Sequence, residues 1–268
     1  MARYNDLNDQ FDGLNIEDEE NSAFVFGDEL QIEGNQYELC VVGRFLTVRN
    51  INVNAMKTKM ADVWRPAMGV NIKELEPGIF LFQFYHKEDM KWVLKGGPWS
   101  FDNAMLVMSE IPDGEEPQNV PLWHVNMWMQ VCDLPSGFMS EVVGKHLGDF
   151  FGEFLEYDSK NNSSLGREFM RIKVRLDVRK ALKRKKKITK KNGVEVMVSC
   201  KYERLGEFCF TCGMLTHTER YCRKFLSNVS EGITKEWGSW LRAPPRRAGI
   251  PAKSRWLREE DDKDWETG

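Results

Sequence analysis

The chain from Tyr37 to Ile111 alternates between two kinds of hydrophobic spacing. Continuous or alternating apolar runs indicate strands, whereas apolar residues three or four positions apart, as at Val53, Met56 and Met60, indicate one face of a helix. These patterns predict strands at 39–48, 70–75, 79–85 and 104–109, and helices at 52–64 and 87–95. The predicted order βαββαβ is that of a ferredoxin-like domain, which we place at residues 36–112.

Phe80, Phe82 and Phe84 fall on one face of the third predicted strand. RNA-recognition modules of the same architecture use aromatic residues on an open sheet face to stack bases. A sheet face covered by helices also needs alternating large apolar residues, and the basic lead of the RNA-binding signature is replaced here by Glu76-Pro77-Gly78. We therefore expect the three phenylalanines to pack in the core.

A second, smaller α+β domain is predicted at residues 121–202. Apolar residues occupy alternate positions from Leu122 to Val131, which is typical of a strand with one buried face. The pattern that follows predicts a helix at 140–151 and strands at 154–158, 169–177, 188–190 and 194–202. Between the last two strands, Asn192-Gly193 favours a tight hairpin turn.

Both ends of the chain have compositions typical of disordered segments. Residues 1–35 carry ten acidic side chains against the single cation Arg3, with no sustained hydrophobic period. Residues 227–268 include Pro244-Pro245 and, further on, a run of four acidic residues. We expect a disordered acidic arm over residues 1–35 and a disordered tail over residues 227–268.

Charge is segregated along the chain. The 268 residues are 41% hydrophobic, enough for two modest domains, and the formal net charge is only −3. The stretch from Arg167 to Lys191 is nevertheless strongly basic, so its local field should attract phosphates. No apolar stretch has the length of a membrane-spanning helix, and the N-terminus shows no basic segment followed by an apolar run. We expect a soluble, nuclear or cytoplasmic protein with no membrane partner.

The most specific motif is a cysteine–histidine array of the form C-x2-C-x4-H-x4-C, made by Cys209, Cys212, His217 and Cys222. Three sulfurs and one imidazole at this spacing can close a tetrahedral Zn²⁺ site. Such a site leaves no open coordination position, so its metal is structural and folds a segment too short to bury a core. Disulfides are the less favoured alternative because the chain has no secretory signal. We place the zinc knuckle at residues 203–226 and predict Zn²⁺ as its cofactor.

Three further motifs accompany the array. They are Lys95-Gly-Gly-Pro-Trp-Ser-Phe101 upstream, Lys201-Tyr-Glu-Arg-Leu-Gly-Glu-Phe208 before the first cysteine, and Trp237-Gly-Ser-Trp240-Leu-Arg242-Ala243 after the last. In this order they resemble plant retroelement-derived proteins in which a gag-like domain precedes a CCHC zinc knuckle. The resemblance covers about residues 36 to 243. It implies a non-enzymatic, retrotransposon-type protein that binds single-stranded RNA or DNA.

The resemblance also implies which side chains contact nucleic acid. Knuckles of this family present an apolar platform for an unpaired base, and Phe210 and Tyr221 occupy positions suited to that role. Arg220, Arg223 and Lys224 lie beside them and are candidates for phosphate contacts. Packing of Phe210 and Tyr221 against the small zinc core is the alternative.

One residue departs from the retroviral type of knuckle. Thr216 stands before the histidine, where such knuckles usually carry glycine. A β-branched residue adopts left-handed backbone angles only with strain, so we expect an altered loop geometry and a possible loss of nucleic-acid affinity.

A cluster of five cations precedes the knuckle, namely Lys183, Arg184, Lys185, Lys186 and Lys187. Its place on the hairpin that leads to the knuckle favours contacts with phosphates. A solvated hairpin face is the alternative, and a nuclear-import signal is compatible with either.

Two classes of function remain open from the sequence. The first is zinc-dependent, largely sequence-nonspecific binding of single-stranded nucleic acid. The second is a protein-interaction module, with self-association or another protein as partner, for which Trp237 and Trp240 are expected to be exposed. Catalytic motifs are missing, and His86, His124 and His146 have no recognisable partner, so we expect neither an enzyme nor a small-molecule substrate.

Overall fold

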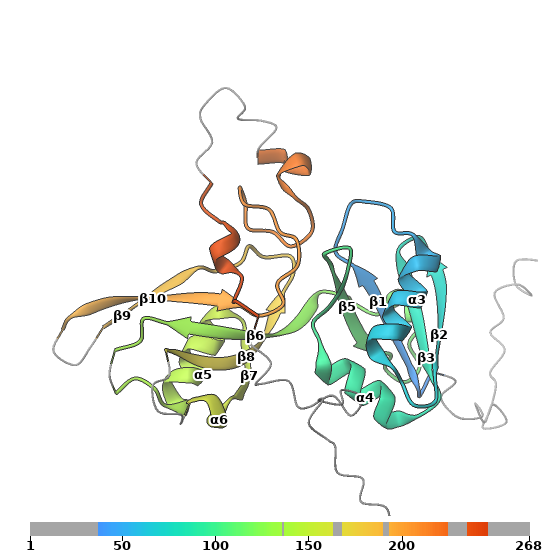
Figure 1. The fold of residues 1–268 in the computed structure, drawn as a ribbon, viewed down its shortest axis with the longest axis horizontal. Helices are drawn as coiled ribbons and strands as arrows, with labels where there is room; N and C mark the ends of the chain where they lie inside the picture. The colour runs from blue at the N-terminus through green and yellow to red at the C-terminus, as the bar shows by residue number, and fades with distance from the viewer. Residues whose placement is uncertain (1–36, 136, 163–167, 190–192, 225–234, 246–268) are drawn as a thin grey trace, which may run out of the picture. The chain divides into compact units, whose positions relative to one another are not determined.

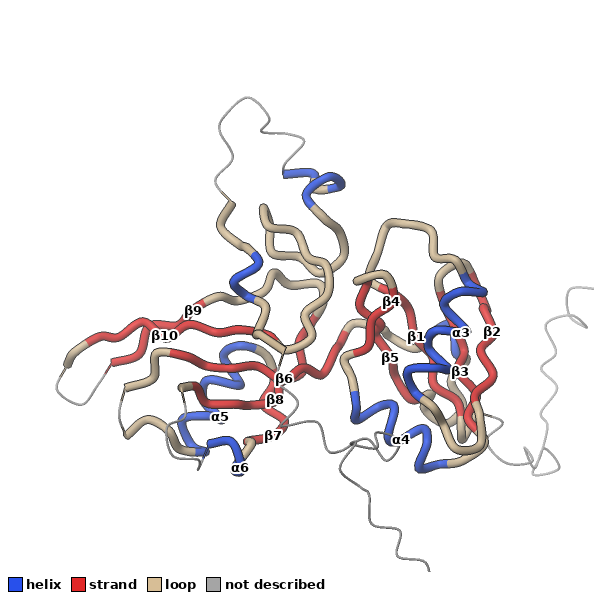
Figure 2. The backbone as a smooth tube through the Cα atoms, viewed as in Figure 1, coloured by secondary structure: helices blue, strands red, loops and turns tan. Residues whose placement is uncertain are grey.

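The computed structural model describes residues 37–135, 137–162, 168–189, 193–224 and 235–245, and its backbone is drawn in Figures 1 and 2. The protein is α+β, with two five-stranded antiparallel sheets. Residues outside the described ranges include the predicted acidic arm, residues 227–234 and 246–268 of the predicted tail, and the turn residue Asn192. Among those that are described, no helix has the length and apolar character needed to cross a bilayer.

The first sheet has the strand order β2-β3-β1-β5-β4. Its elements are β1 (Cys40–Phe45), α3 (Val53–Trp64), β2 (Val70–Glu76), β3 (Ile79–Phe84), α4 (Lys87–Gly96), β4 (Trp99–Phe101) and β5 (Ala104–Glu110). The predicted elements are all present in the predicted order, with β4 in addition. Asp102 and Asn103 join β4 to β5 with φ values of 46° and 64°, the left-handed angles that a two-residue hairpin turn requires.

The core of the first domain contains the three phenylalanines of β3. Phe80, Phe82 and Phe84 are 0%, 0% and 1% exposed, and the ring of Trp64 in α3 meets that of Phe82 edge-on at 5.2 Å. The prediction that these rings pack in the core is therefore confirmed. Because they are covered, this face of the first sheet offers no aromatic platform to a base.

The second sheet has the order β7-β8-β6-β10-β9, and helix α5 packs on it against β7 and β8 (Figure 1). Its elements are β6 (His124–Cys132), α5 (Glu141–Phe151), β7 (Glu153–Tyr157), α6 (Ser159–Asn162), β8 (Phe169–Asp177), β9 (Lys185–Thr189) and β10 (Glu195–Tyr202), preceded by the 3₁₀ helix η1 (Pro117–Asn119). Strand β9 begins three residues before its predicted start. Most of the basic run is therefore strand rather than loop.

An ion-pair network fixes the point where the chain leaves the second sheet. The guanidinium of Arg171 in β8 lies 2.7 Å from a carboxylate oxygen of Asp158 and 2.8 Å from one of Glu203. It also stacks over the ring of Trp128, 3.8 Å from its centroid. Glu203 directly follows β10, so this network anchors the start of the segment that leads to the cysteine array.

The C-terminal segment differs from its prediction. Residues 235–245, expected to belong to a disordered tail, contain the 3₁₀ helix η3 (Ser239–Leu241) and the fully buried Leu241. The amide of Ala243 donates a hydrogen bond to the carbonyl of Tyr202 at 2.9 Å. The prediction of disorder is therefore wrong for residues 235–245, which we call the strap.

Candidate metal centre and nucleic-acid surface

The four predicted ligands converge on one point. One ligand atom from each of Cys209, Cys212, His217 and Cys222 lies within 4.8 Å of the others, and Cys212 Sγ is 3.4 Å from His217 Nε2. A tetrahedral zinc site with Zn–S bonds of about 2.3 Å holds neighbouring ligand atoms roughly 3.5–3.8 Å apart. The arrangement therefore fits one zinc ion with three sulfurs and one nitrogen.

Local backbone contacts create this convergence. The Cys209 amide donates to the carbonyl of Met214 at 2.9 Å, and the Gly213 amide donates to the carbonyl of Cys209 at 2.8 Å. Gly213 has a φ of +73°, a left-handed angle that glycine adopts without strain. The last ligand, Cys222, ends the 3₁₀ helix η2 (Glu219–Tyr221). Figure 2 shows that the segment consists almost entirely of loop, so regular secondary structure contributes little to its stability.

The electrostatics of the cluster favour a bound cation. Burial, reinforced by the neighbouring thiols of Cys209 and Cys222, raises the pKa of the Cys212 thiol to about 12. Three thiolates crowded at this distance would repel one another without a positive charge between them. A divalent cation reverses this effect, because it stabilises the deprotonated form of every sulfur that binds it.

Thr216 does not strain the knuckle as its sequence position suggested. Its φ is not among the positive values found in the described residues, so the left-handed angle that would favour glycine is not required here. Its hydroxyl oxygen lies 3.1 Å from Nδ1 of His217. When Nε2 binds the metal, Nδ1–H can donate to this hydroxyl, an outer contact that orients the imidazole.

The strap holds the knuckle against the second domain through Trp237. The indole Nε1 donates to the carbonyl of Leu182 at 2.7 Å, and the backbone amide of Trp237 donates to the carbonyl of Phe210 at 3.2 Å. The ring covers Gly213 so closely that a Cβ there would lie 2.5 Å from it. The guanidinium of Arg184 lies over the ring, 4.6 Å from its centroid. Trp237 is thus half-buried rather than exposed, whereas Trp240 is 51% exposed.

The Phe210 ring packs against other side chains, whereas the Tyr221 ring is largely exposed. The Phe210 and Phe208 ring centroids are 4.9 Å apart, and the guanidinium of Arg242 in the strap lies 6.0 Å from the Phe210 ring. Arg242 is held there by hydrogen bonds to the carbonyls of Leu205 and Gly206. Phe210 is accordingly half-buried, whereas Tyr221 is 47% exposed. Arg220, Arg223 and Lys224 are all exposed around it.

The cations of the predicted basic run divide into two groups. Arg184 contacts the strap, donating to the Glu236 carbonyl at 2.5 Å, and Lys183 donates to the Phe150 carbonyl at the end of α5. Lys187 pairs with Glu195 across the hairpin at 2.7 Å. Lys185 and Lys186 project from the same strand and are exposed, and the ammonium of Lys186 lies 4.3 Å from the ring of Phe150. Arg184 therefore has a positioning role that its place in a lysine-rich run did not indicate.

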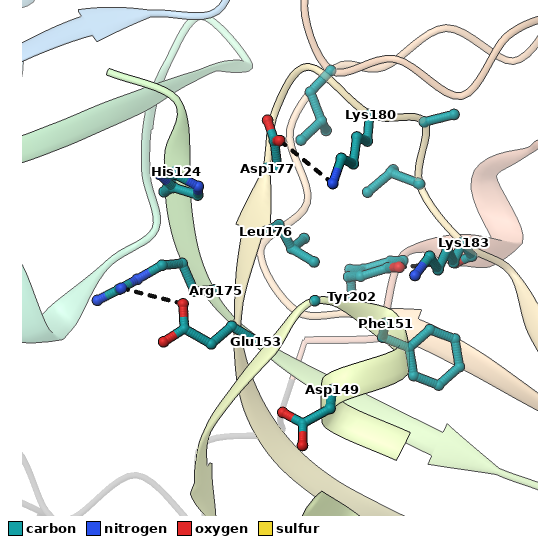
Figure 3. Close-up of a pocket in the computed structure, with 14 residues that line it drawn as sticks. His124, Asp149, Phe151, Glu153, Arg175, Leu176, Asp177, Lys180, Lys183 and Tyr202 are labelled. Carbon is teal, nitrogen blue, oxygen red and sulfur yellow. Dashed lines mark hydrogen bonds and ion pairs between the residues drawn. The ribbon is translucent and has the colours of Figure 1, made fainter. Parts of the chain in front are cut away.

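A cavity of about 310 Å³ lies beside the loop between β8 and β9 (Figure 3). Two ion pairs line it, Arg175 with Glu153 at 3.2 Å and Lys180 with Asp177 at 3.8 Å. Hydrogen bonds from Arg179 hold the pKa of Asp177 well below its usual range. Sequence reasoning missed this cavity because its walls come from separated segments with no shared motif.

Comparisons with known proteins agree with the architecture. Residues 34–119 match the family model "Domain of unknown function (DUF4283)", and residues 176–224 match the model "Zinc knuckle". The chain is 22% identical over 144 residues to "Uncharacterized protein At4g02000" of Arabidopsis thaliana, an alignment covering 50% of this chain. It spans 42% of that protein's length. The matches confirm a first domain followed by a CCHC-type zinc knuckle.

Solved structures are also similar to part of the chain, among them one of a yeast protein. It contains the first two RRM domains of the yeast poly(U)-binding protein Pub1 and aligns with 50% of this chain and 81% of its own, at 11% sequence identity. The TM-score is 0.22, too low to assign this chain a fold from the comparison.

Replacing a ligand should sharply reduce metal binding. We expect the full chain to contain one zinc ion per molecule and His217→Ala to contain far less, because three remaining ligands leave the site open. His146→Ala is the matched control, since that histidine is exposed on α5. Elemental analysis of purified protein measures the stoichiometry. An unchanged zinc content in His217→Ala would show that the metal lies elsewhere.

Removing the strap's main contact should loosen the knuckle. Trp237→Ala deletes a half-buried indole with its hydrogen bond to Leu182, so we expect the local opening free energy of residues 209–217 to fall by about 2 kcal/mol. Hydrogen exchange of these amides should then be about 30-fold faster. Trp240→Ala, on the same segment, should change exchange less than about twofold because its side chain is largely exposed. Equal effects of the two variants would contradict the assignment of Trp237 as the anchor.

Proposed function

We propose that the protein binds single-stranded RNA or DNA with little sequence selectivity, that binding requires zinc, and that the protein is of the retrotransposon gag-like type. The observation that carries this proposal is the grouping, on one metal-organised segment, of an exposed aromatic ring with several cations. Tyr221 is flanked by Arg220 and Arg223, and Lys224 follows. The match of residues 176–224 to a zinc-knuckle model supports the same interpretation.

The chemistry of this surface suits unpaired nucleotides better than duplexes. A base in a duplex has both faces stacked, whereas an unpaired base can place one face on an exposed ring and gain about 1–3 kcal/mol. Every base has such a face, so binding of this kind tolerates any sequence. The cations beside Tyr221 would hold phosphates, and Lys185 and Lys186 extend the positive surface along β9.

The two sheet domains have a supporting role in this proposal. In the first domain the aromatic side chains of β3 are buried, so a ferredoxin-like arrangement serves there as scaffold. In the second domain, the contacts of Arg184 and Leu182 with the strap hold the knuckle in place. We propose a non-enzymatic protein located in the nucleus, the cytoplasm or both, with the basic run of β9 as a candidate import signal.

Salt should weaken binding in proportion to the number of phosphates contacted. For single strands, each contact contributes about −0.7 to the slope of log K against log salt concentration. We therefore expect the double variant Arg223→Ala/Lys224→Ala to reduce the slope by about 1.4. The slope is measured by fluorescence anisotropy of a labelled octathymidine between about 50 and 200 mM salt. The titration is repeated after zinc chelation.

The matched control for this measurement is Lys59→Ala/Lys73→Ala, which removes two exposed cations from the first domain and should leave the slope unchanged. Chelation should remove most of the affinity that persists at high salt, because the stacking surface depends on the metal. Binding that responds to neither salt nor chelator would refute the proposal.

The alternative function is a protein-interaction module in which zinc only stabilises the surface. The exposure of Trp240, a large apolar side chain on the strap, is the observation that favours it. A protein partner should still bind the Tyr221→Ala variant, and the Trp240→Ala variant should no longer bind it. Nucleic-acid binding should show the opposite pattern.

A further inference from the structure

Strand β9 forms one edge of the second sheet, with β10 as its neighbour (Figure 1). The two strands pair in unbroken antiparallel register, from Lys185 opposite Ser199 to Thr189 opposite Glu195. Among the strands that the structure describes, none pairs with the other side of β9. An edge of this kind presents a row of backbone N–H and C=O groups to which a further strand can bind.

The hydrogen bonding of the hairpin determines which backbone groups of β9 face outward. The amide of Cys200 in β10 donates to the carbonyl of Arg184 at 3.0 Å, so these two residues form a bonded pair. Bonded and non-bonded pairs alternate along an antiparallel ladder, and the next bonded residues of β9 are therefore Lys186 and Ile188. The residues whose amides and carbonyls point away from the sheet are Lys185, Lys187 and Thr189.

The other three edges of the two sheets are blunted, whereas this edge is regular. The register of β2 shifts between Glu74 and Glu76, and that of β7 is irregular where Phe154 is followed by Glu156. Strand β4 has only three residues. Bulges and short strands are devices that keep an edge from pairing with another chain. Strand β9 has neither device, and its protection is the charge of three consecutive lysines.

The lysine charges select what can pair with β9. A second copy of β9 would place like charges opposite one another, which is destabilising, whereas a strand that carries carboxylates would be attracted. Lys185 and Lys187 are exposed and project on the same side of the sheet. Lys187 pairs with Glu195 at 2.7 Å, but both side chains are more than half exposed, and such a pair contributes little. Lys187 can therefore exchange this partner for an incoming carboxylate.

The opposite side of the strand is less polar. Lys186 and Ile188 project there, and Ile188 is half-buried. The ammonium of Lys186 lies over the half-buried ring of Phe150, 4.3 Å from its centroid. An incoming strand would thus place one set of side chains beside two lysines and the alternate set beside apolar surface. A sequence in which acidic and apolar residues alternate matches both sides.

We infer that the outer edge of β9 binds an extended acidic segment of a partner protein, in which acidic and apolar residues alternate. The segment adds a sixth strand to the sheet. Main-chain hydrogen bonds to the outward groups of β9 supply affinity, and the lysines select the charge of the partner. This site is separate from the nucleic-acid surface around Tyr221 and does not depend on it, although both would use Lys185.

The inference is tested with labelled heptapeptides and the zinc-loaded full chain, by fluorescence anisotropy at about 50 mM salt, where charge pairs are weakly screened. A peptide of alternating glutamate and valine should bind at least about tenfold more tightly than one in which lysine replaces glutamate. Two further forms of the acidic peptide carry N-methyl groups on alternate amides, which face β9 in one form and solvent in the other. Only the first should lose binding, by about tenfold, because only its methyl groups remove hydrogen bonds to the edge. Equal affinities of the two forms would overturn the inference.

Two variants of one residue isolate the backbone contribution from that of charge. Lys187→Ala and Lys187→Pro both remove an ammonium, but only proline also removes an outward N–H, and it spares the hydrogen bonds to β10. Lys187→Pro should bind the acidic peptide about fivefold more weakly than Lys187→Ala, the value of one hydrogen bond. The two variants should have the same zinc content and the same affinity for octathymidine.

Equal peptide affinities of the two variants would contradict strand addition. If Lys187→Pro weakened octathymidine binding as much as peptide binding, the edge would be a nucleic-acid surface, and the inference would be wrong. The comparison of the N-methylated peptides uses the unaltered chain, so it remains decisive even if proline disturbs the hairpin.

Discussion

Coordination of one cation by four side chains is the interaction on which the C-terminal half of the structure depends. Residues 209–222 contain a single turn of 3₁₀ helix and no strand, so neither a hydrogen-bonded ladder nor a large core holds them in place. Cys209, Cys212, His217 and Cys222 are grouped so that they could hold one metal ion, and closing them around the proposed zinc would supply that missing free energy. The exposed position of Tyr221 and the turn at Gly213 both follow from this closure.

The metal organises the knuckle, and the strap determines where the knuckle lies. Trp237 joins the strap to two other parts of the chain, because it contacts Gly213 in the knuckle and both Leu182 and Arg184 in the loop before β9. A four-ligand site by itself would permit a freely tethered module. Here the module is docked, and its outer surface is continuous with the second domain.

Local sequence signals predicted much of this structure. The spacing of hydrophobic residues located the helices and strands of both sheets, and the spacing of cysteines and histidine identified the metal cluster. Both features are encoded within a few neighbouring residues. The strap and the role of Arg184 were missed, since each depends on contacts between residues far apart in the chain. Packing of Phe210 was one of two alternatives that the sequence left open. Strand β4 was missed for another reason: three residues and a two-residue turn give too short a pattern to detect.

The hydrogen bond between Thr216 and His217 affects how the metal is captured. With Nδ1 held by the hydroxyl, the imidazole points Nε2 toward Cys212. This hydrogen bond limits the rotation of the ring and so holds the ligand atom in the orientation that coordination needs. A glycine at this position would have no hydroxyl and would leave the ring free to rotate. Threonine therefore orients the ligand without backbone strain, since its φ is not positive.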